Sequence, residues 1–185
     1  MTNLTDNQRR WARTLLIVYP RRKKILEALS ETRMKIALGG FSEPGTEELF
    51  GKVIELNYRM QGIHNLYALV KSTLEKLPMR HSELLTMRHV AGKGVAELAD
   101  HVETSVRNVY RRYDRALEAF YGALKKDGHG EEWLTAEYGE DPLIMGIFRR
   151  ADGKTLSTRR KPKRQAEPLH APVISRALES EGKTA

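Results

Sequence analysis

An unbroken heptad pattern of apolar side chains over residues 47–77 is the feature that most constrains the fold. It predicts one helix of about 31 residues with a single apolar stripe. A stripe of that length needs a partner, so we expect either a helical hairpin or a self-associating coiled coil. The stripe consists of Leu49, Val53, Leu56, Met60, Ile63, Tyr67, Val70, Leu74 and Leu77.

A second helical stripe precedes the first one and predicts a helix over residues 21–37, beginning just after Pro20. Its positions alternate at four and three residues: Ile25, Leu29, Thr32 and Ile36. Residues 38–46 contain several glycines and Pro44, which cannot continue a helix. We therefore expect a loop there that joins the two N-terminal helices.

Shorter helices are expected after Pro78, which ends the long one. We expect a short helix before the glycine-bounded turn at residues 91–94, a second over residues 95–101, and a longer one over residues 105–124. The inner face of the longest of these is expected to carry Val106, Val109, Tyr113, Ala116, Leu117 and Phe120. No strand alternation is convincing, so the predicted fold class is all-α.

Positive charge is concentrated in two blocks of the chain. The formal net charge is +8, with +6 over residues 1–35, +7 over residues 149–164 and −5 over residues 126–148 between them. This pattern fits a polyanionic partner. A solvated face combined with a disordered basic tail is the alternative explanation.

The composition also restricts where such a chain works. It has no cysteine, which excludes a disulfide framework and a thiolate nucleophile and suits a reducing cytoplasm. The apolar run near the N-terminus is flanked by arginines but lacks a cleavage site, and no stretch approaches the roughly 20 apolar residues of a membrane span. We expect a cytoplasmic, nucleoid-associated protein with no membrane partner.

Residues 95–115 have the pattern of a helix-turn-helix. Ala99 is small enough for a close helix crossing, and Ser105 stands where an N-cap residue accepts a backbone N–H of the following helix. The outer face of that helix carries Arg107, Asn108, Arg111, Arg112 and Arg115. Guanidinium groups match guanine edges and phosphates, and an Asn amide matches adenine, so this face predicts contact with the major groove. A solvated basic helix in a bundle is the alternative.

At these residues the chain resembles region 4 of the sigma-70 family, the helix-turn-helix that reads the −35 element of promoters. The resemblance spans about 45 residues: SELLTMRHVAGKG, then VAELADHV, then SVRNVYRRYDRALEAF. Two positions depart from the family pattern. Glu103 stands where the family usually has the turn glycine, and Thr104 stands where it usually has a buried aliphatic residue. A non-glycine residue in a left-handed turn costs about 1 kcal/mol.

The remainder of the chain resembles sigma-like transcriptional regulators of phages and prophages in Gram-positive bacteria. The hairpin, its Gly/Ser-rich loop and the EKLP motif before the region 4-like module carry this resemblance. The acidic and aromatic region 2 bundle of small extracytoplasmic-function sigma factors is missing from the N-terminal half. The resemblance implies promoter DNA as a partner and RNA polymerase core as a further candidate, while the heptad stripe makes a second copy of the chain another candidate.

Motifs of catalysis and metal binding are not satisfied. Lys93 lies between two glycines, but the phosphate-loop pattern is broken and no strand precedes it. The six histidines form neither an HExxH motif nor a His/Asp pair, although His81, His89 and His101 are expected to lie near one another in packing or phosphate contacts. We therefore expect no enzymatic activity, no cofactor and no metal.

These observations divide the chain into four segments: an N-terminal hairpin or coiled-coil region (1–78), a region 4-like DNA-binding domain (79–125), an acidic appended segment (126–148) and a disordered basic tail (149–185). The reading they favour is a DNA-binding transcription regulator. Two alternatives remain open. One is a phage small terminase subunit, which combines a helix-turn-helix with an oligomerising helical segment, and the other is a coiled-coil adaptor that binds RNA polymerase without reading DNA.

Overall fold

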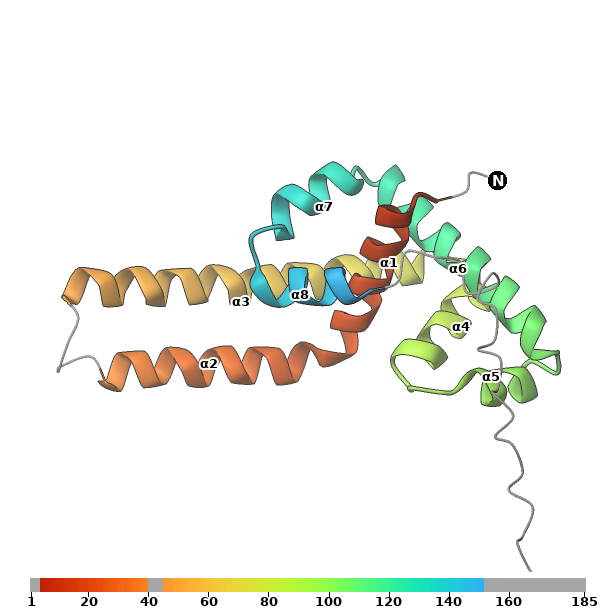
Figure 1. Cartoon of the computed structure of the whole chain (residues 1–185), viewed down its shortest axis with the longest axis horizontal. Coiled ribbons are helices and arrows are strands. Elements are labelled where there is room, and N and C mark those ends of the chain that lie inside the picture. The colour runs from red at the N-terminus through yellow and green to blue at the C-terminus, as the bar shows by residue number, and fades with distance from the viewer. Residues whose placement is uncertain (1–3, 40–44, 152–185) are drawn as a thin grey trace, which may run out of the picture.

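The computed structural model describes residues 4–39 and 45–151, and every regular element in these two ranges is a helix. This confirms the predicted all-α class. The elements are α1 (Asp6–Val18), the 3-10 turn η1 (Tyr19–Arg21), α2 (Arg22–Gly39), α3 (Thr46–Glu75), α4 (Met79–His89), α5 (Val95–His101), α6 (Val106–Lys126), α7 (Glu131–Tyr138) and α8 (Pro142–Arg150) (Figure 1).

The central element is α1, a helix that the sequence analysis did not predict. It starts with a capping box: the Thr5 hydroxyl accepts from the Gln8 N–H, and the Gln8 side chain accepts from the Thr5 N–H. Most of the surface of α1 is buried, including the side chains of Trp11, Leu15 and Leu16. It contacts α3, α4, α6, α7 and α8, so it joins the N-terminal hairpin to the rest of the molecule.

The long heptad helix finds its partner inside the chain. Helices α2 and α3 lie side by side as an antiparallel hairpin (Figure 1). The middle and C-terminal parts of the α3 stripe are buried, as at Ile63 and Val70, whereas Leu49 and Val53 near its N-terminus are only half-buried. The hairpin that the heptad pattern predicts is therefore present, with its packing densest at the base.

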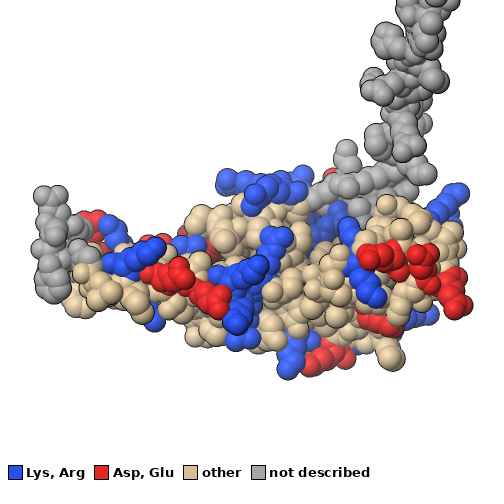
Figure 2. Space-filling model, turned by 90° about the horizontal axis from the view of Figure 1, so that it is seen from below, with Lys and Arg blue, Asp and Glu red and all other residues tan. Residues whose placement is uncertain are grey.

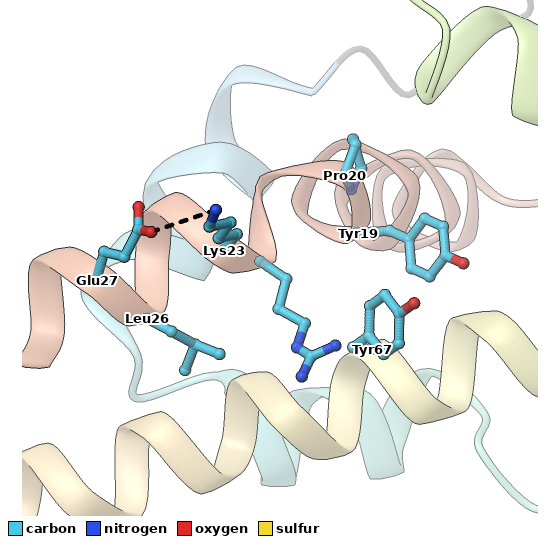
Figure 3. Close-up of a pocket in the computed structure, with 7 residues that line it drawn as sticks. Tyr19, Pro20, Lys23, Leu26, Glu27 and Tyr67 are labelled. Atoms are coloured by element: carbon cyan, nitrogen blue, oxygen red, sulfur yellow. Dashed lines mark ion pairs between the residues drawn. The ribbon is translucent and has the colours of Figure 1, made fainter.

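The base of the hairpin is an aromatic and cationic contact. The rings of Tyr19 and Tyr67 lie against each other (Figure 3) and stack with centroids 4.9 Å apart. The Arg22 guanidinium lies 4.3 Å from the centre of the Tyr67 ring. Stacking of this kind favours one geometry for the bend from α1 through η1 into α2. The direction in which the hairpin projects is thereby fixed at its base.

The acidic segment after α6 folds back onto α1. The sequence predicts only an acidic appended segment over residues 126–148, whereas the structure has two helices there with buried side chains such as Leu134 and Ile144. Asp141 is the N-cap of α8 and Pro142 is its first residue, a pairing that starts a helix because proline has no N–H to leave unbonded. The Trp11 and Phe148 rings, with centroids 4.6 Å apart, hold α8 on α1.

The boundaries of the four predicted segments stay a prediction, except that the start of the fourth segment, the tail, needs a correction. Side chains of the first three segments share one hydrophobic core. The tail was predicted from Arg149 onward, but Arg149 and Arg150 are the last turn of α8, and Ala151 is buried. They continue α8 because two basic residues at a helix C-terminus interact favourably with its dipole. The rest of the predicted tail, residues 152–185, lies outside the described residues.

Candidate nucleic-acid interface

The turn between α5 and α6 has the geometry that a helix-turn-helix requires. The Thr104 N–H donates a hydrogen bond of 2.9 Å to the Ala99 carbonyl. This bond holds the turn against the C-terminal end of α5. Glu103 has a φ of 45°, in the left-handed region. The residue at the position where the family usually has glycine therefore adopts the glycine-type conformation, at a cost of about 1 kcal/mol.

Ser105 and Asn108 build the start of α6. The Ser105 hydroxyl accepts from the Asn108 N–H at 3.4 Å, which confirms the predicted N-cap. The Asn108 side-chain amide in turn donates to the Thr104 hydroxyl at 3.3 Å. The half-buried Thr104 thus acts as an acceptor in the turn rather than as an apolar anchor. The Asn108 amide is held at the turn, with its side chain exposed.

The outer face of α6 is exposed along its first three turns. All the predicted contact residues have exposed side chains: Ser105, Arg107, Asn108, Arg111, Arg112 and Arg115. At 100° per residue, the five of them that lie in α6 fall within about 140° of arc, so they form one face of the helix. Within the described part of the chain, no salt bridge joins any of these four arginines to a carboxylate. Their role in binding stays a prediction.

The opposite face of α6 is buried against α1, α4 and α5, which fixes the direction of the exposed one. The inner positions that the sequence predicts are buried, for example Tyr113, Leu117 and Phe120, with one exception. Val106, the first residue of the helix, is 42% exposed. The face that α6 presents to solvent is therefore polar except at its first residue.

Behind α6, Tyr113 bonds to a neutral histidine. The Tyr113 hydroxyl and His89 Nε2 share a hydrogen bond of 2.8 Å. Burial, with Arg88 and Arg13 nearby, lowers the pKa of His89 to about 4. Burial also raises the pKa of Tyr113, although Arg13 acts in the opposite direction. Both groups are uncharged at neutral pH, so α4 and α6 are joined by a neutral hydrogen bond within the core.

The other two histidines of this region make separate contacts. His101 Nε2 lies 3.3 Å from the Glu83 carboxylate. Burial lowers the pKa of His81, and Arg80 and Arg115 lower it further. No three His, Cys, Asp or Glu residues in the described ranges are placed to hold a metal ion. The three histidines therefore have separate surroundings, and His81 lies close to the positive charges of Arg80 on α4 and Arg115 on α6.

Charge is unevenly distributed over the two helices of the motif. The exposed carboxylates of Glu97, Asp100 and Glu103 lie on α5 and its turn, and acidic side chains gather over this end of the molecule in Figure 2. The exposed arginines lie on α6. A polyanion is therefore attracted to α6 and repelled by the exposed side of α5, which restricts the direction of approach.

Sequence reasoning missed the buried arginines of α1. The Arg9 guanidinium lies 3.5 Å from the Glu118 carboxylate on α6, and Arg13 is buried beside Tyr113. These residues support α6 from behind. The capping box formed by Thr5 and Gln8 was the signal that could have located their helix.

No helix in the described residues is both long enough and apolar enough to cross a membrane.

The comparisons with known proteins agree with this geometry. Residues 67–120 match the family model for sigma-70 region 4, which spans the C-terminal turns of α3, all of α4 and α5, and most of α6. Searches of curated proteins and of solved structures gave no match. The chain therefore contains a sigma-70 region 4 helix-turn-helix domain, and it is in general terms a DNA-binding, sigma-like regulator.

Proposed function

We propose that this protein regulates transcription by binding promoter DNA through α6 and acting there with RNA polymerase core, in the manner of the phage and prophage regulators that it resembles. The observation that carries the proposal is the exposed arginine face of α6 inside the matched domain. Free guanidinium groups on the second helix of a helix-turn-helix have the chemistry and the position for the major groove.

The order of side chains along α6 divides their proposed roles. Residues near the N-terminus of a recognition helix reach base edges, so Arg107 and Arg111 would pair with guanine. Asn108 would exchange its bond to Thr104 for an adenine edge. Further along the helix, Arg112 and Arg115 would contact phosphates, and the exposed Arg80 at the start of α4 would extend this contact.

The N-terminal hairpin supplies a second surface at a distance from the arginine face. It projects away from α4, α5 and α6 (Figure 1), so a protein bound there would not compete with DNA at α6. This separation supports a regulator that contacts polymerase and DNA together. We propose no enzymatic step, because the arrangement needs only binding.

A charge-matched pair of variants tests the proposal. Arg111→Ala/Arg112→Ala/Arg115→Ala removes three exposed arginines from α6, and Arg21→Ala/Arg149→Ala/Arg150→Ala removes three exposed arginines elsewhere. Both lower the net charge equally, so a general electrostatic effect weakens both alike. We expect the α6 variant to lose sequence-specific binding in fluorescence anisotropy titrations with selected DNA fragments, while the control keeps its sequence preference.

The same variants separate the alternatives. Unchanged specific binding by the α6 variant would contradict the proposal. If the chain binds polymerase core equally well without these arginines and shows no DNA preference at all, the adaptor reading is favoured. A closed ring in electron micrographs together with binding at packaging sites would favour the small terminase reading.

A further inference from the structure

Large apolar side chains are exposed together at the free end of the hairpin. They lie on both helices, with exposed fractions between 51% and 76%: Met34 and Leu38 on α2, and Phe50, Ile54 and Tyr58 on α3. These five are half of the ten large apolar side chains that are exposed in the described residues. A concentration of this kind marks an interaction surface on a soluble protein.

These side chains form one continuous face, called here the hairpin-end face. Side chains three, four or seven residues apart share one side of a helix. Phe50 therefore lies on the same side of α3 as Asn57, and Asn57 accepts a hydrogen bond of 2.8 Å from Arg33 of α2. A groove runs between the helices at this level, lined by Ser30, Arg33, Met34, Ala37, Val53 and Asn57.

We propose that a second copy of the chain docks on the hairpin-end face and forms a four-helix bundle with two-fold symmetry. A two-fold axis parallel to the hairpin stacks α2 of one copy on α3 of the other and keeps every residue at its own level. The groove places Met34 at the level of Val53 and Asn57. Met34 of each copy then meets Ile54 of the other, so the face is complementary to itself.

The size of the hairpin-end face fits this occupant. Five large side chains exposed to this extent present about 600 Å² on each copy. Mutual docking covers about 1,200 Å² in total, the lower end of the range for specific stable interfaces. A single apolar segment of another protein would cover only one such face, whereas a second copy covers both at once.

Charge favours the same stacking. At the level of the hairpin-end face, α2 carries two cations (Arg33 and Lys35) against one carboxylate (Glu31). Residues 46–58 of α3 carry three carboxylates (Glu47, Glu48 and Glu55) against one lysine (Lys52). Stacking α2 on α3 brings opposite net charges together, whereas stacking α2 on α2 brings like charges together. With the hairpins fully overlapped, turning one of them end for end would place the apolar side chains against polar Arg22 and His64 at the base.

This inference does not rest on the proposed function, because self-association is measured without DNA. Sedimentation equilibrium of the full chain over about 1 to 100 µM should give twice the monomer mass of 21.1 kDa. Met34→Glu/Ile54→Glu should give the monomer mass with unchanged circular dichroism, since both positions are exposed. The matched control is Met79→Glu, at a residue of α4 that is 82% exposed, and it should remain a dimer.

Cysteine cross-linking tests the register independently, because the chain has no cysteine of its own. A disulfide needs Cα atoms within about 7 Å. We expect Met34→Cys chains mixed with Ile54→Cys chains to cross-link to each other more than either cross-links to itself. A monomeric wild type, a dimeric Met34→Glu/Ile54→Glu variant, or cross-linking that is strongest between two Met34→Cys chains would each overturn the proposal. So would a monomer whose hairpin-end face binds polymerase core instead.

Discussion

The Arg9 guanidinium on α1 lies 3.5 Å from the Glu118 carboxylate on α6 and is almost completely buried, whereas Glu118 is partly exposed. The pair joins the first helix of the chain to the back of the helix that carries the arginine face. Because α1 also carries the hairpin through η1, the position of α6 depends on residues more than one hundred positions earlier in the sequence.

Glu118→Ala is expected to destabilise the fold by about 1–3 kcal/mol, because it leaves the buried Arg9 charge without its partner. Urea denaturation measures the loss. Glu118→Gln, which keeps a hydrogen-bond acceptor, should recover part of it. A loss no larger than that of Glu132→Ala, at an exposed position of α7, would show that the pair contributes nothing.

Acid is expected to weaken the fold through His89. Its pKa is lowered from its ordinary value of 6.5 to about 4 in the folded state, mainly by burial. The unfolded chain therefore binds more protons between these two values, so stability is fully present above pH 6.5 and falls as the pH drops towards 4. The total loss from this residue is about 3 kcal/mol.

His89→Phe removes this proton-binding site and should flatten the stability curve between pH 6.5 and 5. Denaturation at a series of pH values compares the two proteins. The ring signals of His89 in an NMR titration give its pKa directly, and a titration near 6.5 would contradict the buried, neutral state.

Glu103→Gly is expected to stabilise the protein by about 0.5–1 kcal/mol, because glycine adopts a φ of 45° without steric cost. Glu103→Ala is the control, since it removes the same charge but keeps the Cβ atom. Thermal melting separates the two effects. Equal melting temperatures for the two variants would show that charge, and not backbone conformation, decides stability at this turn.

Base-reading and phosphate-binding residues are expected to differ in their response to DNA sequence. Asn108→Ala or Arg111→Ala should cost about 1–3 kcal/mol at a preferred site and relax the preference at one base position. Arg115→Ala should weaken binding to all sequences alike and reduce the salt dependence of the affinity by about one counterion. Titrations on matched and mismatched DNA at several salt concentrations distinguish the two patterns.

Asp141 is expected to anchor α8 through two sets of contacts. Its Oδ1 accepts from the N–H groups of Leu143 (2.8 Å) and Ile144 (3.0 Å), while Oδ2 accepts from Arg59 Nε of α3 at 3.0 Å. Asp141→Ala should cost about 1–3 kcal/mol, whereas Asp141→Asn keeps the cap and should cost less. Hydrogen exchange along α8 locates the effect; unchanged protection in the alanine variant would exclude this anchor.

The elements with one buried face were predicted from the sequence, whereas α1 was missed although its capping box marks its start. The α3 stripe and the inner face of α6 each bury a single side, so their apolar residues recur at helical spacing. Helix α1 is covered on most sides, and Arg9, Arg13 and Thr14 are buried together with Trp11 and Leu15. Trp11, Leu15 and Val18 still recur at helical spacing, but the buried arginines beside them look like exposed positions in the sequence.

The exposed polar face of α6 was predictable in its residues but not in their local bonding. Their spacing alone places the four arginines on one exposed face. The Asn108 amide is bonded to Thr104 because of the conformation of the turn, which includes a glutamate with positive φ. Sequence patterns do not encode such short-range hydrogen bonds, because several turn geometries suit the same residues.

Because α3 is one continuous helix, it holds its two ends at a fixed separation. This helix of 30 residues, about 45 Å long, runs without a break from the hairpin end into the matched domain at Tyr67. A continuous helix has no hinge at which to absorb rotation. Anything held at its far end would therefore be kept at a set distance from the DNA and on a set side of the double helix, so the number of base pairs between two bound sites would have to match the helical phase.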